Sequence, residues 1–379
     1  MEQADDTPLA GLKVVELSHV LAGPICGLML ANMGAEVVKI ERPPKGDSQR
    51  WDVAAEDSLG SDSATFFALN RGKQSHVLDL KVEPDRAALW RIIERSDVLI
   101  ENYRVGVLDR LGFGYAEVSK RQPQLVYCSL SGFGRTGPWA DRGGFDLVAQ
   151  AMSGIMSFTG PEGEEAPIKC GPPVTDIMTG ILAATGVLAA LQRRARTGKG
   201  DHVETSLLDA GVMLTTLQSA LALASSTVPA PMGTAHPLYA PYQCYRTADG
   251  WIALGTANEP NWRRLLGVLD AEALAHDAKF ATTQARVKNR HDLTAALTTR
   301  MRNQKRDDLV EKLTTAGVPC GPVLTVQEML EHPQVRARAL VLDAPHSELG
   351  NAKTIGFPLK FARASLPELL PAPRLSVRE

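Results

Sequence analysis

Residues 12–40 read LKVVELSHVLAGPICGLMLANMGAEVVKI. Within this stretch, residues 12–17 form a short apolar run that predicts a strand, and residues 23–33 show a helical pattern with a proline near the first turn. Residues 36–40 are apolar again and predict a second strand. Apolar strands that alternate with helices are typical of a parallel sheet covered on both faces.

The same alternation continues along the first third of the chain. Residues 76–80, 98–102 and 125–129 are further predicted strands, and residues 87–95 are a predicted helix. We therefore expect an α/β fold whose first part is a doubly wound parallel sheet.

The composition is that of a soluble globular protein with two domains. The chain has 379 residues, and a single hydrophobic core stops growing near about 250–300 residues. A formal net charge of −2 offers no excess of basic groups for a nucleic acid, so nucleic-acid binding is not expected. The five cysteines are widely spaced without a Cys-x-x-Cys pair, which argues against a disulfide framework or a zinc site and favours a reducing compartment.

The sequence also argues against a secreted or membrane protein. Residues 1–8 are acidic and polar and lack the basic and apolar regions of a secretory signal. The apolar stretches at residues 181–191 and 211–224 are shorter or more interrupted than the roughly 20 residues of a membrane span. We expect a cytoplasmic protein that does not bind membranes.

A domain boundary is expected after the middle of the chain. Residues 176–194 and 207–225 are predicted helices, and residues 225–241 then contain four prolines in seventeen positions. The chain is therefore divided into a large domain (1–225), a small α+β domain with linkers (226–330) and a C-terminal segment that returns to the large domain (331–379). In the small domain, residues 243–256 predict a hairpin that turns at Asp249-Gly250.

Residues 132–137 read GFGRTG, a literal G-x-G-x-x-G motif. A dinucleotide fingerprint requires that the third glycine open a helix. Here a loop sequence, PWADRGG, follows instead, and the first strand-to-helix turn at residues 19–24 lacks the glycines. No NAD site is predicted.

Arg42 follows the second predicted strand, and Asn102, Tyr103 and Arg110 lie at or beyond the end of another. In a doubly wound sheet, ligands bind beyond the carboxyl ends of the strands. Because a guanidinium group binds phosphate through two hydrogen bonds, these residues are suited to an adenosine with an additional phosphate. The alternative for Arg42 is an ordinary surface residue beside two prolines.

Asp176 lies among apolar residues at the start of a predicted helix. It is either a cap of that helix or a partly desolvated nucleophile toward an acyl group. Asp146 is a second candidate acid. His19 directly follows the first strand and is more readily explained as part of a ligand wall than as an acid–base group, whereas His236 is either in a lid or in an exposed loop.

Eight segments in order resemble the class III CoA-transferases, the superfamily of formyl-CoA transferase, carnitine CoA-transferase and α-methylacyl-CoA racemase. They are residues 9–43, 70–80, 98–115, 127–138, 143–160, 171–191, 197–210 and 317–323. The resemblance implies a Rossmann-like large domain, a smaller domain and an interlocked ring-like homodimer. It also implies acyl-CoA and carboxylic acid substrates, with no permanently bound cofactor and no metal.

The resemblance gives Asp176 the role of nucleophile. In the transferases the matching aspartate attacks the donor thioester and forms a mixed anhydride and then an aspartyl-CoA thioester. The CoA wall of the family matches His19, Val20, Ala22, Arg42, Leu78, Asn102, Tyr103 and Arg110.

Four residues are expected at the acid substrate: Leu21, Phe145, Asp146 and His236. The racemase branch has a catalytic histidine where this chain has Phe145, and an aromatic hydrocarbon ring cannot abstract a proton. Formyl-CoA transferase has a glutamine where this chain has Leu21, which argues against oxalate chemistry. The pattern is most similar to the branch that uses succinyl-CoA and dicarboxylates such as glutarate, malate or mesaconate. The alternatives are a 2-methylacyl-CoA racemase or epimerase and a CoA-binding subunit without catalysis.

Overall fold

The computed structural model describes residues 6–51, 58–60, 62–225 and 228–375. The chain divides into two compact units. Unit 1 takes Met1–Met156, Lys169–Thr227 and Pro333–Glu379, and unit 2 takes Ser157–Ile168 and Val228–His332. Residues 157–168 pack with unit 2, where the N–H of Gly233 donates a hydrogen bond to the carbonyl of Gly160 (2.8 Å). Residues 1–5, at the acidic start, and 226–227, at the expected domain boundary, lie outside the described residues.

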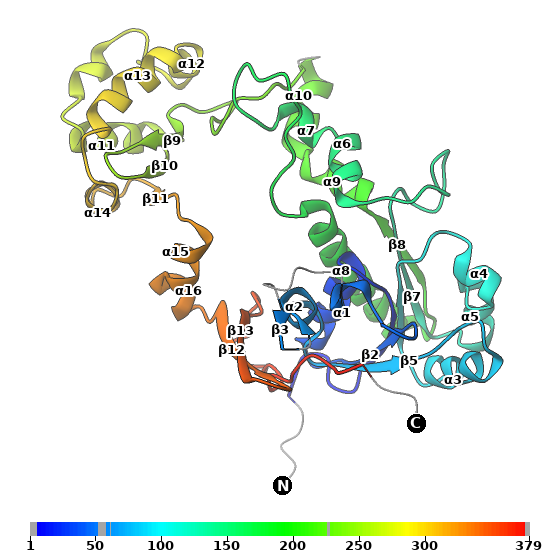
Figure 1. Ribbon diagram of the computed structural model, residues 1–379. Coiled ribbons are helices and arrows are strands. Elements are labelled where there is room, and N and C mark those ends of the chain that lie inside the picture. The colour runs from blue at the N-terminus through cyan, green and yellow to red at the C-terminus, as the bar shows by residue number, and fades with distance from the viewer. Residues whose placement is uncertain (1–5, 52–57, 61, 226–227, 376–379) are drawn as a thin grey trace. The chain divides into compact units, whose positions relative to one another are not determined.

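Unit 1 is built on a six-stranded sheet in the order β5-β2-β1-β6-β7-β8, and every neighbouring pair is parallel (Figure 1). The strands are β1 Lys13–Leu17, β2 Glu36–Glu41, β5 Lys73–Val77, β6 Val98–Glu101, β7 Val126–Ser131 and β8 His202–Ser206. The chain leaves β1 toward β2 on one side and returns to β6 on the other. The strand order therefore reverses at β1 and β6, and such a switch point is where open α/β sheets bind ligands. The expected parallel α/β sheet is confirmed.

Both faces of the sheet carry an apolar layer because side chains along a strand alternate between the faces. Val14 of β1 packs in the layer formed with α1 (Ala22–Ala31) and α8 (Val174–Thr197). Val15 and Leu17 pack in the opposite layer, formed with α3 (Glu83–Ile93) and α5 (Tyr115–Arg121). The remaining helices of five or more residues that lie wholly in unit 1 are α2 Ala64–Asn70, α4 Val107–Leu111, α6 Asp146–Met152, α9 Leu207–Leu214, α10 Thr216–Ser225 and α16 Pro333–Ala337. Two short hairpins, β3–β4 (Ser58–Leu59, Asp62–Ser63) and β12–β13 (Val341–His346, Gly350–Ile355), complete this unit.

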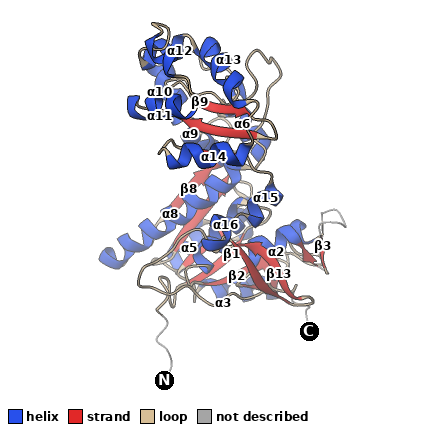
Figure 2. Ribbon diagram, turned by 90° about the vertical axis from the view of Figure 1, so that its left-hand side faces the viewer, coloured by secondary structure: helices blue, strands red, loops and turns tan. Residues whose placement is uncertain are grey.

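Helix α8 is longer than the sequence analysis expected, because it begins at Val174 and ends at Thr197. By length and hydropathy alone it could cross a membrane, a property that it shares with core helices of soluble proteins. It packs on α1, α9, β7 and β8, and Figure 2 shows it beside β8. Ala183, Ala184 and Val187 are buried, so α8 is a core helix of unit 1.

Two further predicted elements differ from the structure, and one strand of the six-stranded sheet was missed. The third strand is Lys73–Val77 and not residues 76–80, because polar residues are tolerated in a strand at the sheet edge. The single helix expected at residues 207–225 is two helices that meet at a 67° bend. Thr215 lies at the break and donates its hydroxyl to the carbonyl of Val212 (2.8 Å), a local bond that competes with helix continuation. β8 was not predicted.

Unit 2 holds a three-stranded antiparallel sheet, β11-β10-β9, with a helical layer. The strands are β9 Tyr242–Arg246, β10 Trp251–Gly255 and β11 Cys320–Pro322, and the helices are α11 Glu259–Val268, α12 Thr283–Lys288, α13 Arg290–Met301, α14 Arg306–Thr315 and α15 Val326–Glu331. The pairing of Arg246 with Trp251 confirms the hairpin expected around Asp249-Gly250.

Candidate active site

A cavity of about 380 Å³ opens beyond the carboxyl ends of β1, β6 and β7 in unit 1. Its wall is made of the turn after β1 (19–22), the segment after β6 (102–105), the end of β7 (130–132), the loop before α6 (140 and 142–145), Val107, Asp176 and Leu207. The cavity therefore lies at the switch point of the sheet. Of the predicted site residues, it brings together Asp176, His19, Val20, Leu21, Ala22, Asn102, Tyr103 and Phe145.

Asp176 is in the first turn of α8 and is partly buried. Burial, and next the negative charge of Asp146, raise the pKa of Asp176 to about 6. Within the described part of the chain, no group donates a hydrogen bond to this carboxylate. A carboxylate that is desolvated and has no donor keeps its lone pairs available to an electrophile.

Asp146, the first residue of α6, has a different environment from Asp176. One of its oxygens accepts hydrogen bonds from the backbone N–H (3.0 Å) and the hydroxyl (2.7 Å) of Thr175. The other oxygen accepts from the side-chain amide of Gln150 (2.7 Å). Asp146 thus fixes the beginning of α8 and does not line the cavity, although Phe145 beside it does and is 74% exposed.

A glycine sets the distance between α8 and the turn after β1. Gly180 lies one helical turn after Asp176, and a Cβ placed on it would lie 2.6 Å from the carbonyl oxygen of Ala22. Only a residue without a side chain permits this approach. The close packing brings the face of α8 that carries Asp176 against residues 19–22.

The turn after β1 is held to the segment after β6. The N–H of His19 donates to the side-chain oxygen of Asn102 (3.0 Å), and the side-chain amide of Asn102 donates to the carbonyl of His19 (2.7 Å). The His19 ring contacts the Tyr103 ring edge-on, with centroids 5.7 Å apart. Burial is the largest influence on the pKa of His19 and lowers it, which keeps the ring neutral near neutral pH.

A second cavity of about 200 Å³ lies beyond the carboxyl end of β2 and shares His19 and Tyr103 with the first. Arg42 and Trp51 are in its wall. The structure therefore places Arg42 on the rim where the sequence analysis expected a phosphorylated adenosine, next to the cavity that contains Asp176.

Besides Asp146, three further predicted site residues lie outside both cavities. Leu78 packs against the apolar layer of α3 and α5. Arg110 is exposed in α4, with its guanidinium close to Gly106. His236 belongs to unit 2, where its ring contacts those of Tyr239 and Tyr242, each with a centroid distance of 5.0 Å.

The sequence analysis missed the cationic part of the first cavity. Arg104 and Arg142 line it, and Arg142 stacks over Trp139 at 3.9 Å from the ring centroid. The dismissed G-x-G-x-x-G segment contributes as well, because Gly132 packs directly on Gly144. A Cβ on Gly132 would lie 2.7 Å from the Cα of Gly144, so the two glycines close the loop that carries Arg142. The sequence pattern that could have indicated Arg142 is the glycine-rich, arginine-containing loop after β7.

No cluster of three or more His, Cys, Asp or Glu side chains suited to a metal ion is found where the chain is described. The polar side chains that line the cavity include the carboxylate of Asp176 and the guanidinium groups of Arg104 and Arg142, besides an imidazole, a phenol, a hydroxyl and an amide. Such a set suits a polyanionic substrate that reacts with a carboxylate.

The sequence profile of CoA-transferase family III matches residues 9–378. The chain is 38% identical over 373 residues to a succinate–glutarate CoA-transferase of Agrobacterium fabrum, a match that covers 97% of this chain and 93% of that protein. It is also 38% identical over 372 residues to an acetyl-CoA:oxalate CoA-transferase of Acetobacter aceti, covering 97% and 93%. A solved structure of a CAIB/BAIF family protein from Brucella suis superposes with a TM-score of 0.86 at 40% identity, covering 97% of this chain and 96% of that one.

Proposed function

This chain belongs to CoA-transferase family III, and we propose that it transfers CoA from succinyl-CoA to a dicarboxylic acid through covalent intermediates on Asp176. The observation that carries the proposal is the pair of acids at the start of α8. Asp146 has its oxygens occupied by Thr175 and Gln150, whereas Asp176 faces the cavity without a hydrogen-bond donor among the described residues.

The first half of the reaction consumes the donor. A carboxylate oxygen of Asp176 attacks the thioester carbon, the C–S bond breaks, and CoA leaves as a thiolate while a mixed anhydride forms. The thiolate then attacks the aspartyl carbonyl, succinate leaves as a carboxylate, and an aspartyl-CoA thioester remains. Each intermediate is an activated acyl group that keeps the free energy of hydrolysis of the thioester, so no external energy source is needed.

The second half repeats these steps in reverse with the acceptor. A carboxylate of the incoming acid attacks the aspartyl thioester and releases the thiolate, which gives a mixed anhydride between Asp176 and the acceptor. The thiolate attacks the acceptor carbonyl of this anhydride and regenerates the Asp176 carboxylate. Since the pKa of Asp176 is about 6, the group is largely ionised at neutral pH, as a nucleophile must be.

We place the two ends of CoA in the two neighbouring cavities. The adenosine with its 3′-phosphate fits the smaller one, where Arg42 offers a guanidinium group. The thioester end fits the larger one, beside Asp176. His19 and Tyr103, which border both cavities, then lie along the middle of the substrate.

The acceptor is proposed to be longer than oxalate. Both relatives named above act on dicarboxylic acids according to their names. In this chain Leu21 lines the cavity near Asp176 and presents an apolar group without a hydrogen-bond donor. An apolar wall favours an acid with methylene groups between its carboxylates over one whose carboxylates are directly joined.

We further propose that the enzyme is a homodimer. Unit 1 exposes large apolar side chains on α6, α9 and α10, among them Leu147 (53%), Met213 (55%) and Leu223 (89%). Exposed apolar surface of this kind is typical of protein interfaces. Sedimentation equilibrium measures the mass directly, and a monomer at micromolar concentration would contradict the dimer.

The test of the reaction uses succinyl-CoA and a panel of dicarboxylic acids, with mass spectrometry of the CoA products. The wild type is expected to form a new acyl-CoA, and Asp176→Asn none. Glu36→Gln is the control, because Glu36 is exposed at the opposite end of β2, and its activity is expected to be unchanged. Hydroxylamine should trap an adduct on the peptide that contains Asp176. Full activity of Asp176→Asn would contradict the mechanism, and α-carbon deuterium uptake into a 2-methylacyl-CoA would favour the racemase alternative.

A further inference from the structure

The turn that joins β1 to α1 has a strained backbone. Val20 has a φ of +68°, in the left-handed region. For a β-branched residue this conformation is a genuine outlier, and it persists only where surrounding contacts hold it. Such outliers gather at functional sites, and this one lies in the wall of the cavity that contains Asp176.

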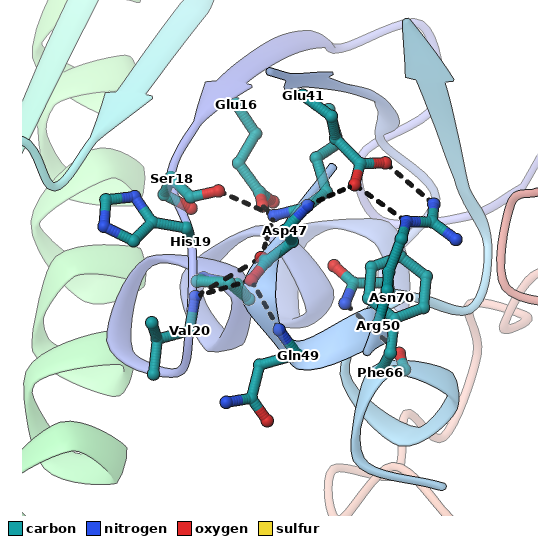
Figure 3. Close-up of polar contacts among 12 residues, drawn as sticks. Glu16, Ser18, His19, Val20, Glu41, Asp47, Gln49, Arg50, Phe66 and Asn70 are labelled. Carbon is teal, nitrogen blue, oxygen red and sulfur yellow. Dashed lines mark hydrogen bonds and ion pairs between the residues drawn. The ribbon is translucent and has the colours of Figure 1, made fainter. Parts of the chain in front are cut away.

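Besides the two hydrogen bonds between His19 and Asn102, the turn is held by the buried side chains of Asp47 and Lys39. The two carboxylate oxygens of Asp47 accept from the N–H of Val20 at 3.2 and 3.3 Å, as Figure 3 shows. The ammonium group of Lys39 lies 3.0 Å from Asp47 and donates to the carbonyl of Ser18 at 2.6 Å. The same pair therefore ties the chain on both sides of His19.

Asp47 reaches this position through the turn that follows β2. Gly46 has a φ of +73°, and its N–H donates to the carbonyl of Arg42 (2.9 Å). The N–H of Asp47 then donates to Glu41 (2.9 Å), and Glu41 is held in turn by the guanidinium of Arg50 (Figure 3). The carboxylate of Asp47 is thereby aimed at the end of β1 by the backbone and by a second buried ion pair.

The side chains of Lys39 and Asp47 are 0% and 1% exposed. Although both border the smaller cavity, their polar atoms are occupied by each other, by Glu16 and by the backbone of the turn. The proposed mechanism uses neither residue. Burial of charged groups is costly, and a buried ion pair is weak evidence for a contribution to stability. The role of the Lys39–Asp47 pair is therefore sought in the turn that it binds.

We propose that Lys39 and Asp47 are positioning residues, which hold residues 18–21 in the strained conformation that shapes the wall of the cavity containing Asp176. The role rests on the proposed function of Asp176. Because Asp47 and Lys39 bind the turn on both sides of His19, loss of the ion pair lets the strained turn relax and moves His19 and Leu21 away from their places in the wall.

The test is a double-mutant cycle between Asp47→Ala and Val20→Gly, read as the rate at which succinyl-CoA acylates Asp176. Glycine adopts a positive φ without strain, so the turn in Val20→Gly no longer needs the restraint. Asp47→Ala is expected to slow acylation by about tenfold in the wild-type background but by less than about threefold in the Val20→Gly background. Asp47→Asn is expected to be intermediate, because its amide oxygen still accepts from Val20.

Hydrogen–deuterium exchange of the peptide that contains residues 18–22 gives a readout that is independent of activity. Asp47→Ala should speed exchange at the Val20 amide. Ser75→Ala is the matched control, because it removes a 2.6 Å hydrogen bond to Glu41 in the same polar cluster without touching the turn. It should change neither the exchange of this peptide nor the acylation rate.

Equal losses from Asp47→Ala in both backgrounds would overturn the proposal, since they would mean general destabilisation or a direct contact with CoA. Unchanged exchange at Val20 would overturn it as well. If Asp47→Ala does not fold, the same cycle with Asp47→Asn decides the question. If none of the acyl-CoA donors acylates Asp176 of the wild type, the proposed function fails. Hydrogen–deuterium exchange and CoA affinity, measured in the same four proteins, then decide the positioning role.

Discussion

Thr175 donates both its backbone N–H and its hydroxyl to the carboxylate of Asp146, and the next residue in the helix is Asp176. The two acids are therefore close enough to interact, yet only Asp146 has its charge compensated by hydrogen bonds. Asp146 sets the geometry of the helix start. Burial, and next the charge of Asp146, raise the pKa of Asp176, which is left available for chemistry.

The first prediction concerns the pH dependence of transfer. Asp176 must be ionised to attack a thioester, so the rate should fall as the pH is lowered through about 6, the pKa of this group. Asp146→Asn removes the like charge but leaves burial, the larger cause of the shift. The acid limb should therefore move to lower pH without reaching the value of an exposed aspartate.

Acylation rates at saturating succinyl-CoA, measured between about pH 4.5 and 8, test this shift. Glu36→Gln serves again as the control and should retain the wild-type profile. An acid limb that stays in place in Asp146→Asn would show that another group controls the ionisation.

The second prediction is that the nucleophile destabilises the fold. The pKa of Asp176 is raised from 3.8 to about 6 in the folded state, so the folded protein binds this proton more tightly than the unfolded chain does. Its contribution therefore favours folding below about pH 4 and is lost as the pH rises through 6. Asp176→Asn should raise the free energy of unfolding by about 1 to 3 kcal/mol near neutral pH, and by much less near pH 4.

Urea unfolding of both proteins at the two pH values tests the sign and size of this effect. A variant that is less stable than the wild type at neutral pH would mean that Asp176 makes a stabilising contact in the folded protein. An Asp176→Asn variant that is inactive but more stable than the wild type is the result expected if Asp176 is kept for catalysis.

The parallel sheet and the position of Asp176 could be predicted from the sequence, because both depend on local patterns. Apolar runs such as VVEL and VLIE are typical of strands buried on two faces, and an aspartate among apolar residues at a helix start is unusual. The edge strand at Lys73 was misplaced because its polar alternation gives a weak signal beside the apolar side chains of Leu78 and Leu80.

The rest of the site depends on long-range packing. The interaction of Asp47 with Val20 joins positions 27 residues apart, and no periodicity indicates it. The contact of Gly132 with Gly144 is a backbone approach across a loop, so the glycine motif was visible while its role was not. Asp146 was predicted to lie at the acid substrate, and in the structure its carboxylate accepts hydrogen bonds from Thr175 and Gln150. The sequence does not separate these roles, because a helix-start residue and a catalytic acid can have the same side chain.

The third prediction concerns Gly180. In an exposed helix, replacing glycine by alanine stabilises by about 1 kcal/mol. At this position the new Cβ would lie 2.6 Å from the carbonyl of Ala22 and 2.7 Å from Ile25, so α8 must move away from α1. Overpacking of this kind costs about 1 to 3 kcal/mol, and Gly180→Ala should therefore lower both the melting temperature and the rate of acylation.

Gly267→Ala is the matched control for this change. Gly267 is also inside a helix, and the nearest atom to its Cβ would be 3.9 Å away, so alanine should be neutral or stabilising there. If Gly180→Ala were as harmless as Gly267→Ala, the close approach of α8 to the turn after β1 would not govern the position of Asp176.

The last prediction separates the two ends of the CoA site. Arg42 is the guanidinium group of the smaller cavity, so Arg42→Ala should weaken binding of a substrate that carries a 3′-phosphate. We expect KM for succinyl-CoA to rise by about tenfold or more with little change in kcat, because the contact is the same in the ground state and the transition state.

Dephospho-succinyl-CoA lacks the 3′-phosphate and provides the matched control. Its KM should already be high with the wild type and should change by less than about twofold in the variant. Arg110→Ala, which changes an exposed residue outside both cavities, should affect the two substrates equally. A selective loss at Arg110 instead of Arg42 would reverse the assignment and place the phosphate beside α4.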